Sequence, residues 1–243
     1  MALTDNLISF WELGEASGTR NDSHGTNHLT DNNTVTQTTG KVGNCAQLTL
    51  ANSEYLSVAD NSSLSVTSTD SWTFCAWVYA DSLPTFMMVA SKSGSSSSNI
   101  AWDLFYYNDG SVWTFAVSTD AGASYTNNVQ VSQSISTATW YFVVWWFDFA
   151  TSTIKLQVND GTPGSASSTA PADSSSDLRI GARYSTAELF WNGRIDQVGF
   201  WKRILDSTER STLYNSGNGV SYADISGGGG GGGVLAMMMQ NEG

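Results

Sequence analysis

Apolar residues in this chain come in short runs separated by polar turns, a pattern typical of β-strands. The most apolar run, Trp140 to Phe149, is too short to span a bilayer as a helix, and its aromatic content predicts a buried strand. Trp72 to Tyr79 is apolar on both sides, which indicates a central strand covered on each face. Further strands are expected at 7–13, 40–48, 54–58, 104–107, 112–117, 154–158, 178–182 and 195–201. The pattern therefore predicts an all-β sandwich of about a dozen strands.

Two connections are predicted to be tight hairpin turns. Asn108-Asp109-Gly110 lies between the strands expected at 104–107 and 112–117, and Asn159-Asp160-Gly161 follows the strand at 154–158. An Asp-Gly pair supplies the positive φ angles that such turns require.

After the last expected strand, at 195–201, the hydrophobic pattern changes from that of a strand to that of a helix. Asp206 can cap the first turn of a helix, and Glu209, three residues later, completes a capping box. Leu213 and Tyr214 give this short helix an apolar edge. Gly217 can adopt the left-handed conformation that ends a helix.

Three motifs carry a resemblance to a known family. They are the strand and helix from Gly193 to Gly217, the segment from Trp11 to Asn27 (W-E-L-G-E-A-S-G-T-R-N-D-S-H-G-T-N), and Gly40-Lys-Val-Gly. With these motifs the chain, from Leu7 to about Gly219, resembles the laminin-G-like jelly rolls of the concanavalin A-like lectin/glucanase superfamily. The resemblance implies an antiparallel jelly-roll β-sandwich with one short C-terminal helix.

Composition narrows the function classes. Aromatic residues make up 12% of the chain and charged residues 13%, which favours strands and polar turns. The net charge of −12 repels phosphate groups, so nucleic acid and anionic membranes are not expected as partners. Residues 1–6 lack the basic start and apolar run of a secretory signal, and no apolar stretch is long enough for a membrane span. The expected compartment is a cytoplasm in which Cys45 and Cys75 are buried thiols; a disulfide between them is the alternative.

Catalysis is not expected. Glucanases of the resembled superfamily take their paired carboxylates from an E-x-D-x-E strand, which this chain lacks. Glu12 and Glu15 lie on either side of Gly14, and strand geometry would not aim them at one point. The sequence contains neither a G-x-S-x-G nor an H-E-x-x-H motif.

Asp22 and Asp196 match acidic positions that often bind Ca²⁺ in the resembled family. Calcium takes six to eight oxygen ligands, and a loop rich in Gly and Asn can turn carbonyl groups towards the ion. The alternative is structural: Asp22 could cap a turn, and Asp196 could pair with Arg194 or Arg20.

Aromatic residues interspersed with polar ones are candidates for glycan binding, because sugar rings stack on aromatic faces. The candidates chosen from this set are Trp102, Trp113, Tyr184 and Trp191. Tyr106, Tyr107 and Tyr125 belong to the same wider set. The alternative for each is a place in the core of the sandwich.

The chain is divided into a jelly-roll domain, 1–225, and a C-terminal segment, 226–243. In that segment Gly227 to Gly233 are expected to form an extended spacer. The apolar residues after it are expected to anchor the domain to another subunit: Val234, Leu235, Met237, Met238 and Met239. The segment therefore predicts a larger homo- or hetero-assembly.

The resemblance and the compartment together favour a non-enzymatic structural or recognition module of a bacteriophage virion, as a capsid decoration, fibre or tail appendage. Such a particle is assembled in the host cytoplasm, and its module can bind cell-surface glycans. The alternative is a carbohydrate-binding module of a microbial surface protein, located outside the cell.

Overall fold

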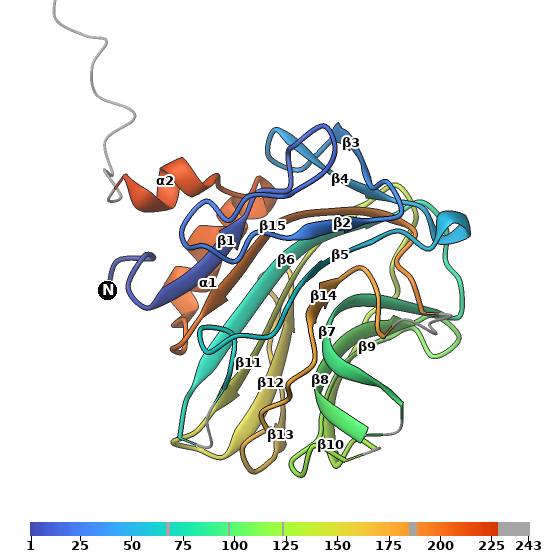
Figure 1. Cartoon of the computed structure of the whole chain (residues 1–243). Helices are drawn as coiled ribbons and strands as arrows, with labels where there is room; N and C mark the ends of the chain where they lie inside the picture. The colour runs from blue at the N-terminus through green and yellow to red at the C-terminus, as the bar shows by residue number, and fades with distance from the viewer. Residues whose placement is uncertain (67–68, 97, 123, 185–188, 228–243) are drawn as a thin grey trace, which may run out of the picture.

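The computed structural model describes residues 1–66, 69–96, 98–122, 124–184 and 189–227. These residues form two antiparallel sheets packed face to face in a jelly-roll sandwich, with short helices outside one sheet (Figure 1). The predicted all-β architecture is confirmed. The anchoring residues Val234, Leu235, Met237, Met238 and Met239 lie outside the described residues.

The first sheet has eight strands among the described residues. Its order is β13 (Gly164–Ser167), β12 (Thr153–Val158), β11 (Trp140–Asp148), β6 (Trp72–Ala80), β15 (Gly193–Trp201), β4 (Asn44–Leu48) and β3 (Thr36–Thr39), with β1 (Leu7–Trp11) also paired to β15.

The second sheet has seven strands in the same part of the chain. Its order is β10 (Asn127–Ser132), β9 (Val112–Val117), β8 (Ser98–Tyr107), β7 (Phe86–Ser96), β14 (Leu178–Ile180), β5 (Tyr55–Val58) and β2 (Thr30–Asn32).

Strands β6 and β11 are apolar on both faces, as their sequences predict, because each face packs against a different layer. In β11, Val143 and Trp145 belong to the core between the two sheets, whereas Phe142 and Trp146 belong to a second cluster outside the eight-stranded sheet. Continuous rather than alternating apolar runs follow from burial on two sides.

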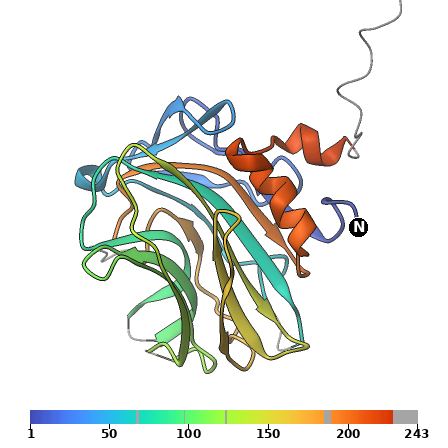
Figure 2. The same ribbon diagram turned by 180° about the vertical axis from the view of Figure 1, so that it is seen from behind.

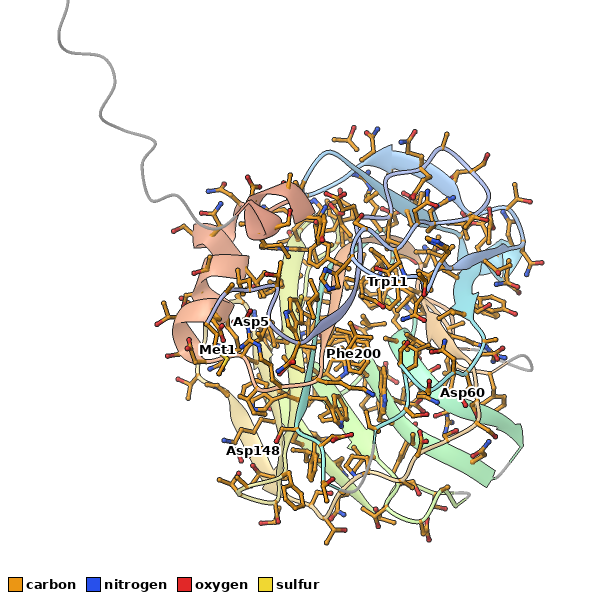
Figure 3. The ribbon with its side chains drawn as sticks, turned by 60° about the vertical axis from the view of Figure 1, so that its left-hand side comes forward. Met1, Asp5, Trp11, Asp60, Asp148 and Phe200 are labelled. Carbon is orange, nitrogen blue, oxygen red and sulfur yellow. The ribbon has the colours of Figure 1, made fainter. Side chains whose placement is uncertain are left out.

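Two helices cover the outer face of the eight-stranded sheet (Figure 2). Leu213 of α1 (Ser207–Tyr214) and Ile225 of α2 (Tyr222–Ser226) belong to the same cluster as Trp77 and Phe142 of that sheet. The N-terminal residues Met1 and Asp5 lie beside these helices, while Trp11 and Phe200 are fully buried inside (Figure 3).

The capping box of α1 is confirmed: the backbone N–H of Glu209 donates to Asp206, and that of Asp206 donates to Glu209, both at 2.9 Å. The helix ends before Gly217, because Asn215 already adopts the left-handed conformation at φ 48°. Helix α2 and the 3₁₀ turns at Leu50–Asn52 and Asn215–Gly217 were not predicted.

Both predicted hairpins form, but the Asp-Gly pairs do not supply the positive φ angles. Those angles lie at Ser111 (φ 50°) and Asn159 (φ 54°) instead. The physical reason is loop length: Tyr107 pairs with Val112, so four residues make the first turn rather than two.

Candidate functional site

The outer face of the seven-stranded sheet carries no helix in the described part of the chain, unlike that of its partner sheet (Figures 1 and 2). Side chains alternate between the two faces of a strand. In β8, Trp102, Leu104 and Tyr106 point into the core. Asp103, Phe105 and Tyr107 therefore occupy the outer face.

Aromatic rings follow one another across this outer face. We call Phe86, Phe105, Tyr107, Tyr125 and Tyr184 the aromatic strip. Phe86 stacks on Tyr107 with ring centroids 4.6 Å apart and contacts Phe105 at 6.2 Å. Phe105 stacks on Tyr125 at 6.4 Å. Phe86 is 39% exposed, and the other four rings are partly exposed. The strip thus presents apolar ring surface to solvent.

Arg183 connects the last two rings of the aromatic strip. Its guanidinium lies 5.2 Å from the ring centroid of Tyr125 and 5.1 Å from that of Tyr184. A planar cation between two aromatic faces is held by cation–π attraction.

Asp103 lies beneath the strip and binds the side chains of Arg183, Tyr125 and Ser93. Its side chain is fully buried, and its carboxylate contacts Arg183 at 2.7 Å, the Tyr125 hydroxyl at 2.5 Å and the Ser93 hydroxyl at 2.6 Å. Burial raises the pKa of Asp103, while Arg183 and the hydrogen bonds oppose that rise. Burial and the Asp103 charge also raise the pKa of Tyr125, so its hydroxyl stays a donor.

Two loops bring these residues over the sheet. Tyr125 lies between β9 and β10, where Asp120 accepts the backbone N–H of Gly122 at 2.8 Å and closes a turn. Arg183 lies between β14 and β15, in a loop fastened by the bond from Trp191 N–H to the Gly181 carbonyl at 2.8 Å. Both loops converge on Asp103, so one buried carboxylate joins three segments of the chain.

The same outer face continues beyond the strip through Arg179. Its guanidinium donates to the Arg183 carbonyl at 3.0 Å, lies 5.6 Å from the Tyr55 ring centroid and pairs with Asp177 at 3.6 Å. Tyr55 in turn contacts Phe190 at 6.2 Å between ring centroids. The polar and aromatic surface therefore extends from β8 to β5.

Of the four predicted glycan-binding residues, Tyr184 is the one on this surface. Trp102, Trp113 and Trp191 are at most 1% exposed and belong to the core between the sheets. Their prediction as sugar-stacking residues is corrected, because a ring buried on both faces has none left for a ligand. The strict alternation of β8, which puts Tyr106 inside and Tyr107 outside, is the sequence signal that could have separated the two groups.

The carboxylate of Asp22 accepts four backbone N–H groups. They belong to Phe10 at 3.0 Å, His24 at 3.1 Å, Gly25 at 2.9 Å and Asn27 at 3.0 Å. These bonds fold the polar loop back onto β1, which corresponds to the turn-capping alternative for this residue.

Asp196 accepts the backbone N–H groups of Lys41 at 2.7 Å and Val42 at 2.9 Å. This carboxylate thus joins the last long strand to the Gly40-Lys-Val-Gly turn. It does not pair with Arg194 or Arg20, which the structural alternative had suggested; both donate to backbone carbonyl groups.

Asp22 and Asp196 already act as hydrogen-bond acceptors in the structure. N–H donors occupy their oxygens, and the described residues contain no group of three or more His, Cys, Asp or Glu side chains that could hold a metal ion. Calcium binding by Asp22 and Asp196 stays a prediction, which a melting temperature unchanged by a chelator would contradict.

Burial raises the pKa of Asp196 from 3.8 to about 7, although the N–H groups of Val42 and Lys41 oppose this. Between pH 3.8 and about pH 7, Asp196 keeps its proton in the folded protein but releases it in the unfolded chain. Raising the pH through this range therefore lowers the free energy of unfolding. A shift of the Asp196 pKa from 3.8 to about 7 changes the free energy of unfolding by about 4 kcal/mol at most. We expect Asp196→Asn to lose this part of the pH dependence between pH 4 and 7, as measured by urea unfolding.

The pKa of Asp103 is raised too. Its contribution to the pH dependence of unfolding should remain in both the wild type and Asp196→Asn. Equal slopes of unfolding free energy against pH in the wild type and in Asp196→Asn would contradict the assignment.

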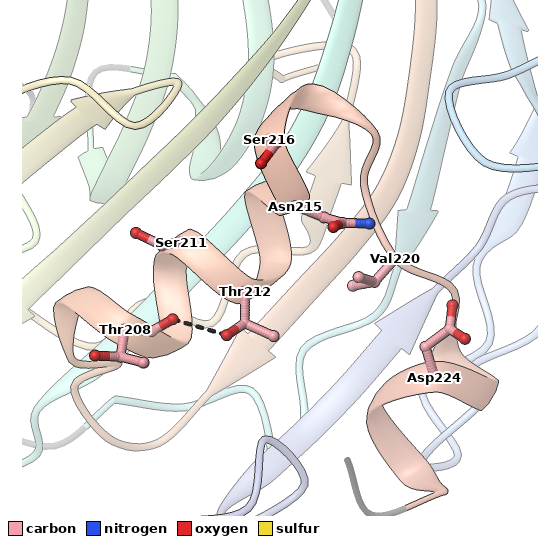
Figure 4. A pocket seen from close by; sticks show the side chains of 7 residues that line it. All are labelled: Thr208, Ser211, Thr212, Asn215, Ser216, Val220 and Asp224. Carbon is pink, nitrogen blue, oxygen red and sulfur yellow. Dashed lines mark hydrogen bonds between the residues drawn. The ribbon is translucent and has the colours of Figure 1, made fainter. Parts of the chain in front are cut away.

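A hollow lies on the helical side of the molecule. It has a volume of about 580 Å³ and is lined by Thr208, Ser211, Thr212, Asn215, Ser216, Val220 and Asp224 (Figure 4). Part of its polar lining is already hydrogen-bonded: Thr212 donates to the Thr208 carbonyl at 2.8 Å, Ser211 donates to Asp160 at 2.8 Å, and Asp224 accepts from Ser221. This hollow lacks the aromatic surface of the strip.

Both cysteines are buried free thiols, and burial raises the pKa of each to about 12. A thiol with so high a pKa is a poor nucleophile. No helix in the described ranges is long and apolar enough to cross a bilayer.

The two packed antiparallel sheets place the chain among the jelly-roll sandwich folds. The family model described as the concanavalin A-like lectin/glucanases superfamily matches residues 50–209. The chain belongs to this superfamily, as the sequence motifs implied. No curated protein matches the chain.

Several solved structures share the fold. The binding domain of Paraclostridial Mosquitocidal Protein 1 has a TM-score of 0.67 at 16% identity, over 88% of this chain and 53% of that one. The binding domain of Botulinum Neurotoxin DC in complex with SialylT has a TM-score of 0.63 at 13% identity, over 88% of this chain and 52% of that one. This chain thus spans about half the length of the toxin binding domains.

Domain 4 of AbnA, a GH43 extracellular arabinanase from Geobacillus stearothermophilus, in complex with arabinotriose, is similar over nearly its full length. The TM-score is 0.56 at 15% identity, over 85% of this chain and 97% of that one.

Proposed function

We propose that this chain is a non-enzymatic carbohydrate-recognition module and that the aromatic strip is its binding surface. The observation that carries the proposal is the series of contacts from Tyr107 through Phe86, Phe105 and Tyr125 to Arg183 and Tyr184. Sugar rings stack on such faces while polar neighbours bond their hydroxyl groups. Similar folds solved in complex with SialylT and with arabinotriose support the proposal.

The charge arrangement at the strip favours binding over hydrolysis. A glycosidase of the common kind needs two carboxyl groups on either side of the scissile bond. Asp103 is fully buried and held by Arg183, Tyr125 and Ser93, so its carboxylate is placed to orient other side chains. We expect no release of reducing sugar from any oligosaccharide that the protein binds.

Replacement of single rings tests the binding surface. Tyr107→Ala and Phe86→Ala should each weaken the binding of neutral oligosaccharides, arabinotriose among them, by about tenfold, which corresponds to the loss of one stacking contact of about 1.4 kcal/mol. Isothermal titration calorimetry with the full chain gives the dissociation constants.

Phe149→Ala is the matched control, since Phe149 is 46% exposed, compared with 39% for Phe86, and follows β11 of the other sheet. Binding that all three substitutions leave unchanged, or weaken equally, would contradict the proposal.

The setting of the module, a virion or a cell surface, stays a prediction. The proposed anchor, Val234 to Met239, is tested by truncation after Ser226. The shortened chain should fold normally and be missing from purified particles; normal occupancy would place the anchor elsewhere.

A further inference from the structure

The aromatic strip differs from a site for acidic sugars in its charge balance. A ligand carboxylate that leaves water needs a cationic partner, because an unpaired charge is costly to desolvate. All ten Lys and Arg residues of the sequence lie in described segments, so the surroundings of each possible Lys or Arg partner are known. The residues outside those segments contain no Lys or Arg and two glutamates, Glu188 and Glu242.

Both guanidinium groups on the outer face already have carboxylate partners. Arg183 contacts Asp103 at 2.7 Å, and Arg179 contacts Asp177 at 3.6 Å. Arg183 cannot be released without leaving the fully buried Asp103 uncompensated. Turning towards a ligand would also cost Arg183 its cation–π contacts with Tyr125 and Tyr184.

Lys92, the remaining cation of the seven-stranded sheet, is 1% exposed. It contacts Asp60 at 2.6 Å and Asp173 at 4.0 Å, and it donates to the carbonyl groups of Ser174 and Ser176. The other seven cations lie in loops, on the eight-stranded sheet or in and next to α1: Arg20, Lys41, Lys155, Arg194, Lys202, Arg203 and Arg210. None of them belongs to the seven-stranded sheet or the two loops over it.

We infer that the aromatic strip selects uncharged glycans and discriminates against sialylated or uronic-acid-containing ones. This inference rests on the proposed function and adds the ligand class. A neutral sugar needs ring faces and hydrogen-bonding groups, which the strip provides. An acidic sugar would meet paired guanidinium groups in a protein with a net charge of −12, where the long-range field repels it as well.

The experiment compares lactose with 3′-sialyllactose, and arabinotriose with an oligogalacturonate of equal length. Binding to the full chain is measured by calorimetry at low and at physiological salt. We expect the neutral member of each pair to bind about tenfold more tightly or better, with little dependence on salt. Tighter binding of the acidic member, weakened by salt, would overturn the inference and leave the proposed function standing.

Asp177→Asn tests the cause of the discrimination, because it frees Arg179 without disturbing Asp103. The affinity for the acidic probes should rise about tenfold. Asp148→Asn is the matched control: it frees Lys155, 3.9 Å away on the eight-stranded sheet, and changes the net charge equally. An equal rise in both variants would overturn the inference in favour of a net-charge effect. Binding of neither class would overturn the proposed function and the inference with it.

Discussion

Gly193→Ala is expected to destabilise the domain by more than about 3 kcal/mol, because the new side chain has no space and the backbone conformation is unfavourable. Gly193 has a φ of +143°, and a Cβ atom there would lie 2.0 Å from the carbonyl oxygen of Tyr79 and 2.9 Å from the amide nitrogen of Asp81. Both neighbours are backbone atoms next to or within the central strand β6, so they cannot move without breaking the sheet. Chemical denaturation measures the loss.

Gly18→Ala measures the cost of a positive φ angle without a steric conflict. Gly18 also has a positive φ, +72°, but a Cβ atom there would meet nothing within 4 Å. Its replacement should cost about 1 kcal/mol, the usual penalty for a non-glycine residue in this region. Similar losses for both variants would show that close packing against β6 is not what requires glycine at position 193.

Asp103→Ala should have the second large effect, a loss of about 3 kcal/mol in unfolding free energy together with loss of glycan affinity. The substitution leaves Arg183, with 17% side-chain exposure, and the hydroxyl groups of Ser93 and Tyr125 without their shared acceptor. The two loops over the sheet then lose their common attachment, so Tyr125 and Tyr184 no longer hold fixed positions in the strip.

Asp148→Ala is the control. Asp148 pairs with Lys155 at 3.9 Å, and the lysine side chain is 29% exposed. Such a pair should contribute less than about 1 kcal/mol to the free energy of unfolding. A stable Asp103→Ala protein with unchanged glycan affinity would show that the strip is ordered by other contacts.

The motifs that carry the family resemblance serve the fold rather than the proposed site. The indole N–H of Trp11 donates to the Asn27 carbonyl at 2.6 Å, and Asp22 accepts three N–H groups of its own loop and the Phe10 N–H of β1. Asp196 accepts from Lys41 and Val42. These side chains satisfy backbone groups that would otherwise be buried without a partner, although Asp196 and Lys41 are 155 positions apart.

The sequence by itself determined ten strands, the helix cap and the sandwich, because alternation, turn residues and capping residues act over a few positions along the chain. Strands β2, β3, β7, β10 and β13 were not located from the sequence. Composition and spacing did not separate the buried tryptophans from the exposed rings, since a sandwich buries rings from both sheets: Trp102, Trp113 and Trp191 are all in the core. Tertiary structure alone decided the site. Asp103, Tyr125 and Arg183 are distant in the chain, and only the antiparallel order of the seven-stranded sheet and its two overlying loops brings their charges and rings into contact.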